Sequence, residues 1–363
     1  PPVPVLQGRS RQSRVVLYAL GPRSAMDHSI SAEAPEVDVF STVSISSPSS
    51  NHGDAIYSQP ELYELAFSYR DIKSEVKFLR EVHKLHGSGG SLQSVLDLGS
   101  GPGNHAMGLA ASGVGHVVGL EANPSMLQHA QAKARVHSTE PGKQVKGTVL
   151  FVLGDMTRLA DLKLPTSSAG SGANGSGGGG FGAGSKASSK QQGSISAGQF
   201  DMVTCLLGTF THLLTNKQAR AAFRGISSVL KPHGLFILEL AHPGDLFDGT
   251  LIISPDAGKE MWEVPHGKGK LLVEWGADLD QFDSVTQVVE RTVSMNLFDD
   301  KEAILQSIEE MVPARQYTCQ EIDLLAEGAG LSIVQMYGDL STGIDLYHED
   351  SYRLVMVLEK HAL

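Results

Sequence analysis

Short apolar runs alternate with segments of helical periodicity over most of the chain after residue 56. Segments with apolar residues three and four positions apart, such as Ile72–Leu85 and Lys217–Leu230, predict helices. The short runs predict buried strands, and these are Val95–Leu98, Val117–Glu121, Val149–Leu153, Phe200–Leu206 and Leu235–Leu240. Strands that alternate with helices in this way are typical of an α/β fold with a doubly wound sheet.

The pattern changes after the fifth apolar run. Trp262–Val264, Lys270–Trp275 and Val285–Leu297 each predict a strand, and they are separated by a glycine turn and an acidic segment. Strands joined without helices predict an antiparallel β insertion at about residues 250–300, which would serve as a lid or a dimer surface. Beyond it the chain ends in one helical pattern, which starts at Tyr317, and two strand patterns.

Two segments have compositions that bury little apolar surface. Residues 1–55 have no acidic residue before Asp27 and include the arginines Arg9, Arg11, Arg14 and Arg23. Such a leader resembles a transit peptide to an organelle stroma or matrix, with the chloroplast favoured, and the alternative is a disordered tail on a cytoplasmic protein. Residues 166–198 are rich in Ser, Gly and Ala and predict a low-complexity insertion within a domain that spans 56–363.

The composition restricts the classes of partner. A net charge of −11 disfavours nucleic acid as the principal partner. No apolar run is long enough to span a bilayer, so we expect a soluble protein with no membrane partner. The two cysteines, Cys205 and Cys319, form neither a disulfide framework nor the spacing of zinc ligands, and no cluster of His and carboxylate side chains predicts a metal site.

The segment Ser94–His105 carries the clearest chemical signal. An apolar strand pattern runs into three glycines at alternate positions, Gly99, Gly101 and Gly103, and a helical pattern follows. Such a turn bends the backbone sharply and lets a ligand approach without meeting a Cβ atom. The spacing differs from the G-x-G-x-x-G of dinucleotide-binding enzymes. Moreover, Asp97 would repel a phosphate, whereas it suits a cation.

At these residues the sequence resembles the class I S-adenosylmethionine-dependent methyltransferases, whose first motif is similar to Val95–Gly103. The resemblance covers roughly residues 57–360 apart from the low-complexity insertion. It implies a Rossmann-like, doubly wound, mostly parallel seven-stranded sheet with an antiparallel last strand. It also implies S-adenosylmethionine as the cofactor, a ligand that carries an ammonium and a sulfonium group and no phosphate.

The resemblance also implies cofactor-binding roles for residues at successive strand ends. Glu121 is expected to accept from the ribose hydroxyls and Asp155 from the adenine amino group, while Met156 packs on the ring. Tyr63 and Tyr69 would stack on the cofactor or hydrogen-bond to it, although each also fits a core position. The complete predicted set is Tyr63, Tyr69, Asp97, Gly99, Gly101, Gly103, Glu121, Ala122, Asp155, Met156 and Leu206.

The acceptor side is less clearly defined by the sequence. Methyl transfer from a sulfonium is an in-line displacement, so alignment supplies much of the catalysis and no catalytic residue is obligatory. His212 and His242 follow the fourth and fifth strand patterns, where the ligand crevice of an α/β sheet is expected. They are therefore candidates for a substrate contact or a general base.

The sequence thus predicts a methyltransferase that acts on a small-molecule acceptor, and it leaves N-, O- and C-methylation open. An amine acceptor would suit the acids of the insertion and its rim, which are Asp245, Glu263, Glu274, Asp278, Asp280 and Asp283. A homodimer formed through the β insertion is a further hypothesis. The alternatives are an NAD(P)-dependent Rossmann oxidoreductase and a non-catalytic protein that binds the cofactor or assists assembly.

Overall fold

The computed structural model describes residues 55–139, 147–161, 163–165, 192–194, 198–247, 260–278 and 280–362. All of them belong to one compact unit that extends from His52 to Leu363. The predicted leader, residues 1–55, and the predicted low-complexity insertion, residues 166–198, lie almost entirely outside the described residues.

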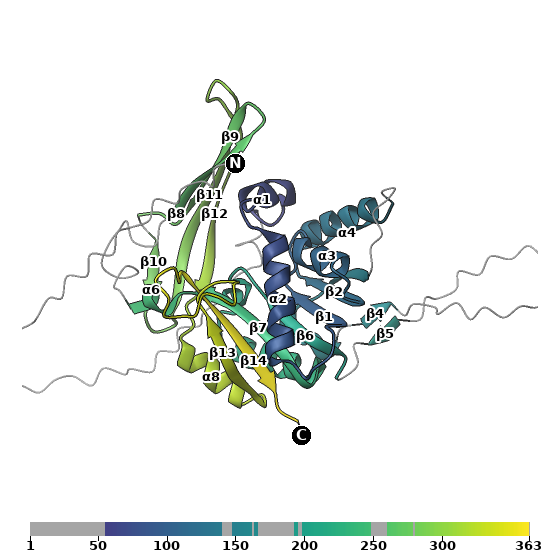
Figure 1. The fold of residues 1–363 in the computed structure, drawn as a ribbon. Coiled ribbons are helices and arrows are strands. Elements are labelled where there is room, and N and C mark those ends of the chain that lie inside the picture. The colour runs from purple at the N-terminus through teal and green to yellow at the C-terminus, as the bar shows by residue number, and fades with distance from the viewer. Residues whose placement is uncertain are drawn as a thin grey trace, which may run out of the picture. The chain divides into compact units, whose positions relative to one another are not determined.

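A seven-stranded sheet in the order β13-β14-β7-β6-β1-β2-β3 forms the centre of this unit (Figure 1). Strands β1, β2, β3, β6 and β7 run parallel to one another, whereas β14 runs antiparallel to both of its neighbours. The strands are β1 (Ser94–Leu98), β2 (His116–Glu121), β3 (Thr148–Leu153), β6 (Phe200–Cys205), β7 (Leu230–Ala241), β13 (Leu331–Tyr337) and β14 (Arg353–Lys360). The predicted Rossmann-like sheet with an antiparallel last strand is confirmed.

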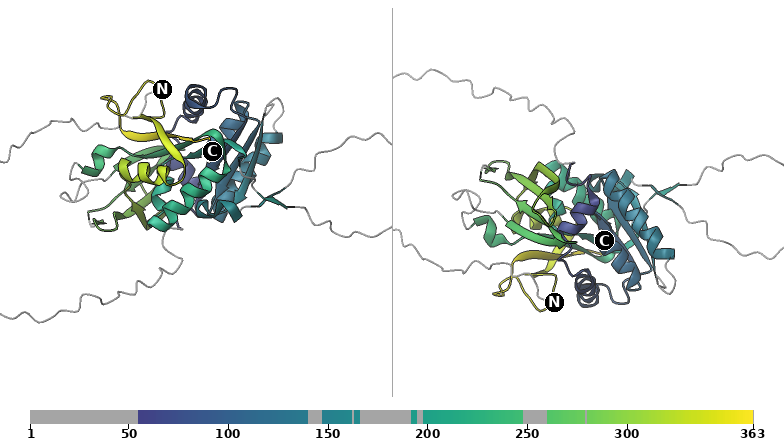
Figure 2. Two further views of the ribbon diagram at one scale, coloured as in Figure 1. Left: turned by 90° about the horizontal axis from the view of Figure 1, so that it is seen from below. Right: turned by 90° about the horizontal axis from the view of Figure 1, so that it is seen from above.

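Helices cover both faces of this sheet (Figure 2). Successive side chains of a strand point to opposite faces, so Val95 packs with α2, α3 and α4, whereas Leu96 packs with α5 and α8. Both positions are fully buried, which explains why both are apolar. The helices are α2 (Ile72–His86), α3 (Asn104–Ala111), α4 (Pro124–Thr139), α5 (Asn216–Val229), α6 (Pro243–Phe247) and α8 (Cys319–Glu327), with the 3-10 helices η1 (Met156–Asp161) and η2 (Thr209–His212).

A separate antiparallel sheet follows α6 in the sequence. It contains β8 (Glu260–His266), β9 (Gly269–Trp275), β10 (Gln281–Asp283), β11 (Val288–Phe298) and β12 (Ile304–Arg315). The order is β10-β11-β9-β8, and β12 pairs with β11. The strands therefore continue to Arg315, beyond the boundary near residue 300 that the sequence indicated. Strand β12 escapes sequence prediction because apolar residues at Leu305, Ile308, Met311 and Val312 do not alternate strictly.

Helix α1 (Pro60–Ala66) packs on this second sheet. Leu62 and Ala66 belong to a hydrophobic cluster with Val273 of β9 and Met295 of β11. In addition, the indole Nε1 of Trp262 donates to the Ala66 carbonyl oxygen at 2.8 Å. The second sheet thus holds α1 in place, and the first residues of the domain are tied to an insertion far along the sequence.

The two ends of the low-complexity insertion meet in a short hairpin. Strand β4 (Lys163–Pro165) pairs antiparallel with β5 (Gln192–Ser194). Among the described helices, none combines the length and the apolar character required to cross a membrane.

Candidate functional site

The glycine turn after β1 has the geometry that its sequence requires. Gly99, Gly101 and Gly103 have φ angles of +61°, +52° and +82°, and Gly103 is the N-cap of α3. A Cβ atom at Gly99 would lie 2.3 Å from Cγ2 of Thr209, whereas a Cβ atom at Gly101 would meet no atom within 4 Å. Gly99 therefore permits close packing of η2, and Gly101 leaves open space in which a ligand fits.

A recess lies beside this turn, between α1 and the residues that follow β6. It brings together five of the predicted cofactor residues, Tyr63, Asp97, Gly99, Gly101 and Leu206. Its other lining residues are Glu64, Phe67, Arg70, Ile72, Ser100, Pro102, Asn104, His105, Leu207 and Thr209. Three segments that are distant in the sequence thus enclose one site, in agreement with the expected crevice at the carboxyl ends of the strands.

Asp97 supplies a buried negative charge at this recess. Its side chain is nearly inaccessible, and Oδ1 accepts a hydrogen bond of 2.8 Å from the Thr204 hydroxyl. Burial raises the pKa of the Asp97 carboxyl, and the nearby His105 offsets part of this effect. A carboxylate desolvated in this way gains most from a cationic partner.

Arg70 supplies a positive charge at the same recess, and sequence reasoning missed it. Its Nε donates to Glu75 at 2.8 Å, and its two Nη atoms donate to Glu239 at 3.3 and 3.2 Å. A guanidinium group has five N–H donors, so two remain after these three contacts. The recess therefore presents the Arg70 guanidinium and two carboxylates, Asp97 and Glu64, of which Glu64 is already paired with Lys133. Asp97 and Arg70 together fit a zwitterionic amino acid group such as the methionyl end of S-adenosylmethionine.

Glu121 lies next to the recess at the end of β2 and is also buried. Its Oε2 accepts from the Gly101 amide and its Oε1 from the Asn123 amide, both at 2.8 Å. Burial raises the pKa of Glu121, although these amides and that of Ala122 oppose the rise. Because a carboxylate has about four lone-pair positions, it retains acceptor capacity for hydroxyl groups. Ala122 itself is exposed at the surface.

The end of β3 supplies a more exposed pair of predicted residues. Asp155 is exposed, and its Oδ1 accepts from the amide and the hydroxyl of Thr157, each at 2.8 Å. This arrangement starts η1 and places Met156 against the core cluster that contains Leu159. Asp155 therefore has a structural role as the start of η1, and its exposure also leaves it accessible to a ligand.

Tyr63 and Tyr69 lie in different surroundings. Tyr63 lines the recess, where burial and then the charge of Glu121 raise the pKa of its hydroxyl. Tyr69 is about half exposed, and its ring lies 6.1 Å from that of Trp262 on β8, outside the residues that line the recess. The sequence assigned both tyrosines to the cofactor, but the structure brings only Tyr63 to the glycine turn.

His212 forms a pair with Tyr57, a residue that the sequence did not single out for the site. The Tyr57 hydroxyl lies 3.0 Å from Nε2 of His212. The imidazole also forms a hydrogen bond with the backbone of Pro313. Because proline has no backbone N–H, the imidazole N–H must donate to the Pro313 carbonyl oxygen. Loss of solvation among the surrounding atoms lowers the pKa of His212, although solvent still reaches the ring. The geometry therefore favours a neutral His212 whose Nε2 accepts from Tyr57.

His242 lies beyond the end of β7 in a different set of contacts. Its Nε2 lies 3.3 Å from the Leu346 carbonyl oxygen, and its Nδ1 accepts from the Gly244 amide at 3.1 Å. Both ring nitrogens are engaged with backbone in the start of α6 and the loop before β14. This arrangement gives His242 a structural role, and nothing in it pairs His242 with His212.

Helix α1 covers the recess, and ion pairs hold it to α4. Glu64 pairs with Nζ of Lys133, and its Oε2 lies 2.9 Å from Nε2 of His129. The same Lys133 ammonium donates to the Pro102 carbonyl oxygen at 3.1 Å and to Asn104 at 2.7 Å. Lys133 thereby ties α1 directly to the glycine turn.

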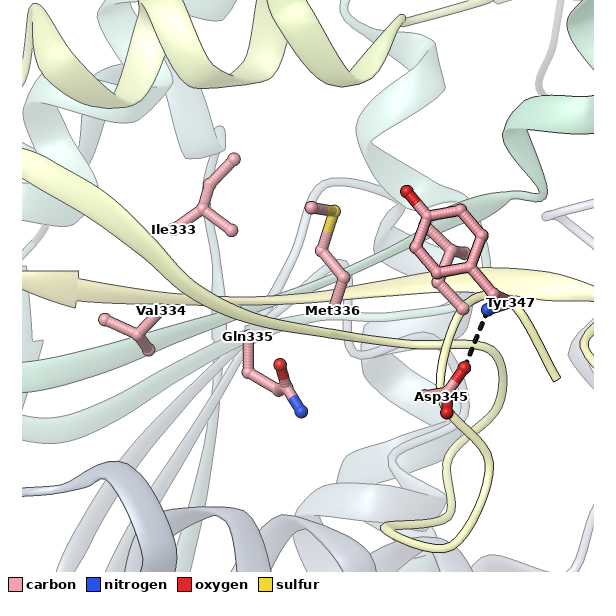
Figure 3. A pocket seen from close by; sticks show the side chains of 7 residues that line it. Ile333, Val334, Gln335, Met336, Asp345 and Tyr347 are labelled. Atoms are coloured by element: carbon pink, nitrogen blue, oxygen red, sulfur yellow. Dashed lines mark hydrogen bonds between the residues drawn. The ribbon is translucent and has the colours of Figure 1, made fainter.

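A second recess lies at edge strand β13 (Figure 3). Its lining is mostly apolar, and its one carboxylate, Asp345, accepts from the Tyr347 amide at 2.8 Å. It shares no residue with the recess at the glycine turn. Among the described residues, no group of three His, Cys, Asp or Glu side chains is placed to hold a metal ion.

Comparison with known proteins adds to this geometry. A family model described as a methyltransferase domain matches residues 95–168. None of the curated proteins matches the sequence significantly. Many solved structures match this fold, and the following three are examples at low sequence identity.

The first is an S-adenosylmethionine-dependent methyltransferase from Clostridium acetobutylicum, with 17% identity, a TM-score of 0.56, and coverage of 82% of this chain and 96% of that one. An amino pentose methyltransferase from Micromonospora echinaspora, solved with S-adenosylmethionine, has 19% identity and a TM-score of 0.52, and the match covers 82% of this chain and 96% of that one. A sugar N-methyltransferase from Streptoalloteichus has 14% identity and a TM-score of 0.52, and the match covers 94% of this chain and 100% of that one. At these identities the likeness concerns the fold.

Proposed function

We propose that the chain transfers a methyl group to a small-molecule acceptor by in-line displacement. Its matched domain, its motifs and its fold are those of a class I S-adenosylmethionine-dependent methyltransferase. Its cofactor is S-adenosylmethionine. The observation that carries the proposal is the recess at the glycine turn, where Asp97 and Arg70 present opposite charges. The bound cofactor supplies a methyl group activated on a sulfonium, which leaves the protein to align the reactants and, where needed, to remove a proton.

The charges of the recess give each residue a distinct role in our proposal. Asp97 holds the ammonium group of the methionyl end, and Arg70 holds its carboxylate with the two N–H donors left by Glu75 and Glu239. Glu121 accepts from the ribose hydroxyls while its backbone contacts keep the glycine turn in position. At the end of β3, the Asp155 carboxylate accepts from the adenine amino group and Met156 covers the ring.

The Tyr57–His212 pair suits removal of a proton from the acceptor. A neutral imidazole whose N–H is directed at the Pro313 carbonyl has its other nitrogen available as a base. The Tyr57 hydroxyl lies on that nitrogen and serves either as a contact to the acceptor or as a relay for its proton. His242, with both nitrogens on backbone groups, orients the loop before β14 and takes no part in the transfer.

We infer that the acceptor group is an amine on a small, polar molecule. Phe67, just after α1, lines the recess, and its ring lies 5.8 Å from that of Trp262 on the second sheet. Tyr69, outside the recess, lies 6.1 Å from Trp262 and extends this aromatic group. Aromatic faces favour cations, and the exposed Glu260 of β8, on the same face of the strand as Trp262, adds negative charge. The names of two structural neighbours, an amino pentose and a sugar N-methyltransferase, support the same class.

The proposal is tested in two steps on the purified protein. Titration calorimetry should detect binding of S-adenosylmethionine and of S-adenosylhomocysteine but not of NAD or NADP, since Asp97 disfavours a pyrophosphate. Transfer of labelled methyl from S-adenosylmethionine into a size-fractionated cell extract should then label the fraction below a few kilodaltons. Label found only in macromolecules would overturn the small-molecule acceptor. A reaction without the protein serves as the control.

We further propose that two copies associate through the second sheet. Strand β12 is an edge strand that exposes Ile304, Leu305 and Met311, with exposed fractions of 61%, 63% and 48%. Apolar side chains on a long edge favour pairing with a second strand. Sedimentation should give a dimer, and Leu305→Asp should shift it to a monomer with cofactor affinity unchanged.

We also propose that residues 1–55 direct the protein to an organelle, with the chloroplast favoured, on the basis of their basic, acid-free start. Fluorescent fusions of the full chain, with and without residues 1–55, test this. Diffuse cytoplasmic fluorescence from both fusions would contradict it.

A further inference from the structure

The residue that follows Leu206 has an unusual backbone conformation. Leu207 has a φ angle of 54°, and Gly208 follows with 67°. The left-handed region is unfavourable for a residue with a Cβ atom and persists where the surroundings hold it. This turn leads into η2, which packs Thr209 against Gly99 and places His212 beside Tyr57.

A single carboxylate holds this turn from the neighbouring strand. Oε2 of Glu239, on β7, accepts from the Leu207 amide at 2.8 Å. The same carboxylate accepts from both Nη atoms of Arg70 and, at 2.6 Å, from Nη1 of Arg353 on β14. Glu239 is 5% exposed, so these contacts occur in a poorly solvated environment.

The two arginines explain why the residue at this position is an acid. The side chains of Arg70 and Arg353 are only 3% and 14% exposed, and buried cations need a charged partner. Burial by itself would raise the pKa of Glu239, but the charges of Arg70 and Arg353 outweigh it and hold the pKa below its ordinary value. Glu239 therefore stays ionised at physiological pH.

We infer that Glu239 is a positioning residue for methyl transfer, because it fixes relative to each other Arg70 and the Leu207 turn, which both line the cofactor recess and of which the turn leads on to His212. This inference rests on the proposed function. Glu239 touches neither ligand in this arrangement. Through Arg70 it acts on the methionyl end of the cofactor, and through Leu207 it acts on the segment that carries Thr209 and His212.

The substitution Glu239→Gln tests the inference, because an amide cannot accept at both ends. One of its ends would present N–H donors either to the Leu207 amide or to Arg353. Glu239→Asp retains the charge but is one methylene shorter, so it cannot reach Arg70 and Leu207 equally well. The matched control is Glu81→Gln, which removes the charge of an exposed residue on α2 that pairs with Lys77.

The affinities for two ligands distinguish a positioning role of Glu239 from a merely structural one. S-adenosylhomocysteine has the amino acid end that Arg70 would hold, whereas 5′-methylthioadenosine has the nucleoside alone. We expect Glu239→Gln to lower the affinity for S-adenosylhomocysteine at least tenfold and the affinity for methylthioadenosine less than twofold. Glu239→Asp should give an intermediate loss, and Glu81→Gln none. Hydrogen exchange at the amides of residues 207–213 should accelerate in both Glu239 variants.

The outcomes are decisive in each direction. If a folded Glu239→Gln chain binds both ligands as the wild type does, or loses affinity for both equally, Glu239 has no positioning role. If Glu239→Gln does not fold, the same comparison on Glu239→Asp decides. A wild-type chain that binds neither ligand would instead overturn the proposed function.

Discussion

The Tyr57 hydroxyl lies 3.0 Å from Nε2 of His212, and 155 residues separate the two positions in the sequence. This contact joins η2 to the segment just before α1, the helix that covers the cofactor recess. The pair combines a potential base with a hydroxyl group that orients it. If His212 is the base, as proposed, its protonation state determines whether it can accept a proton.

We predict that His212 is neutral at pH 7. Desolvation lowers the pKa of its imidazole below the ordinary value of about 6.5. Because the neutral form accepts the proton, methyl transfer should be constant near neutral pH and fall as the pH drops through the lowered pKa. Titration of the imidazole signals by NMR measures this pKa, with His212→Gln to assign the resonance. A midpoint at or above 6.5 would contradict the prediction.

Asp97→Asn should weaken the binding of S-adenosylmethionine by about tenfold or more. The substitution removes the charge that faces the ammonium group, and a charge-assisted hydrogen bond in a desolvated site contributes about 1.5–3 kcal/mol. Calorimetry measures the affinity. Thr204→Val is the matched control, since it removes only the neutral hydrogen bond to Asp97 and should change the affinity much less. Equal affinities of the Asn variant and the wild type would contradict the proposed contact between Asp97 and the ammonium group.

Glu121→Gln should weaken binding of the nucleoside part of the cofactor. Its amide cannot accept at both ends, so one of the contacts to Gly101 and Asn123 is lost together with acceptor capacity for the ribose. We expect about a tenfold loss of affinity for S-adenosylhomocysteine and a similar loss for 5′-methylthioadenosine. Unchanged binding of methylthioadenosine by a folded Glu121→Gln chain would exclude the ribose contact.

Removal of residues 166–191 should leave the fold and the cofactor affinity intact. Strands β4 and β5 already pair through Pro165 and Gln192, so an Asn-Gly turn can join these two residues. Loop closure changes the free energy of unfolding by only about 0.6 kcal/mol per doubling of length. Thermal unfolding and calorimetry of the shortened chain check both properties. A large loss of either would mean that the removed segment supports the domain.

Lys133→Met should accelerate cofactor release by roughly fivefold, which corresponds to about 1 kcal/mol. Lys133 links Glu64 of α1 to the Pro102 carbonyl oxygen and to Asn104, so its loss frees α1 from the glycine turn. Stopped-flow displacement of bound cofactor measures the rate. Lys77→Met, at an exposed pair on α2, is the control and should leave the rate unchanged. Identical release rates would show that α1 does not gate the site.

The sequence alone determined the framework of this protein. The short apolar runs indicated buried strands, and the spacing of Gly99, Gly101 and Gly103 indicated a sharp turn, which the structure shows to have positive φ angles. The cofactor roles predicted for Asp97 and Glu121 came from the resemblance to methyltransferases and from their places at strand ends, since the carboxyl ends of parallel strands meet at one edge of the sheet. These features depend on residues that are neighbours in the chain, so local periodicity reveals them.

Tertiary structure decided which side chains meet at the site. Arg70 and Glu239 lie 169 residues apart, and no local pattern indicates that they share hydrogen bonds. The same holds for Tyr57 and His212, and the separation of Tyr69 from the recess followed only from the packing of α1 on the second sheet. Strand periodicity specifies which face of an element is buried, whereas partners across elements depend on how those faces pack, and this depends on the whole chain.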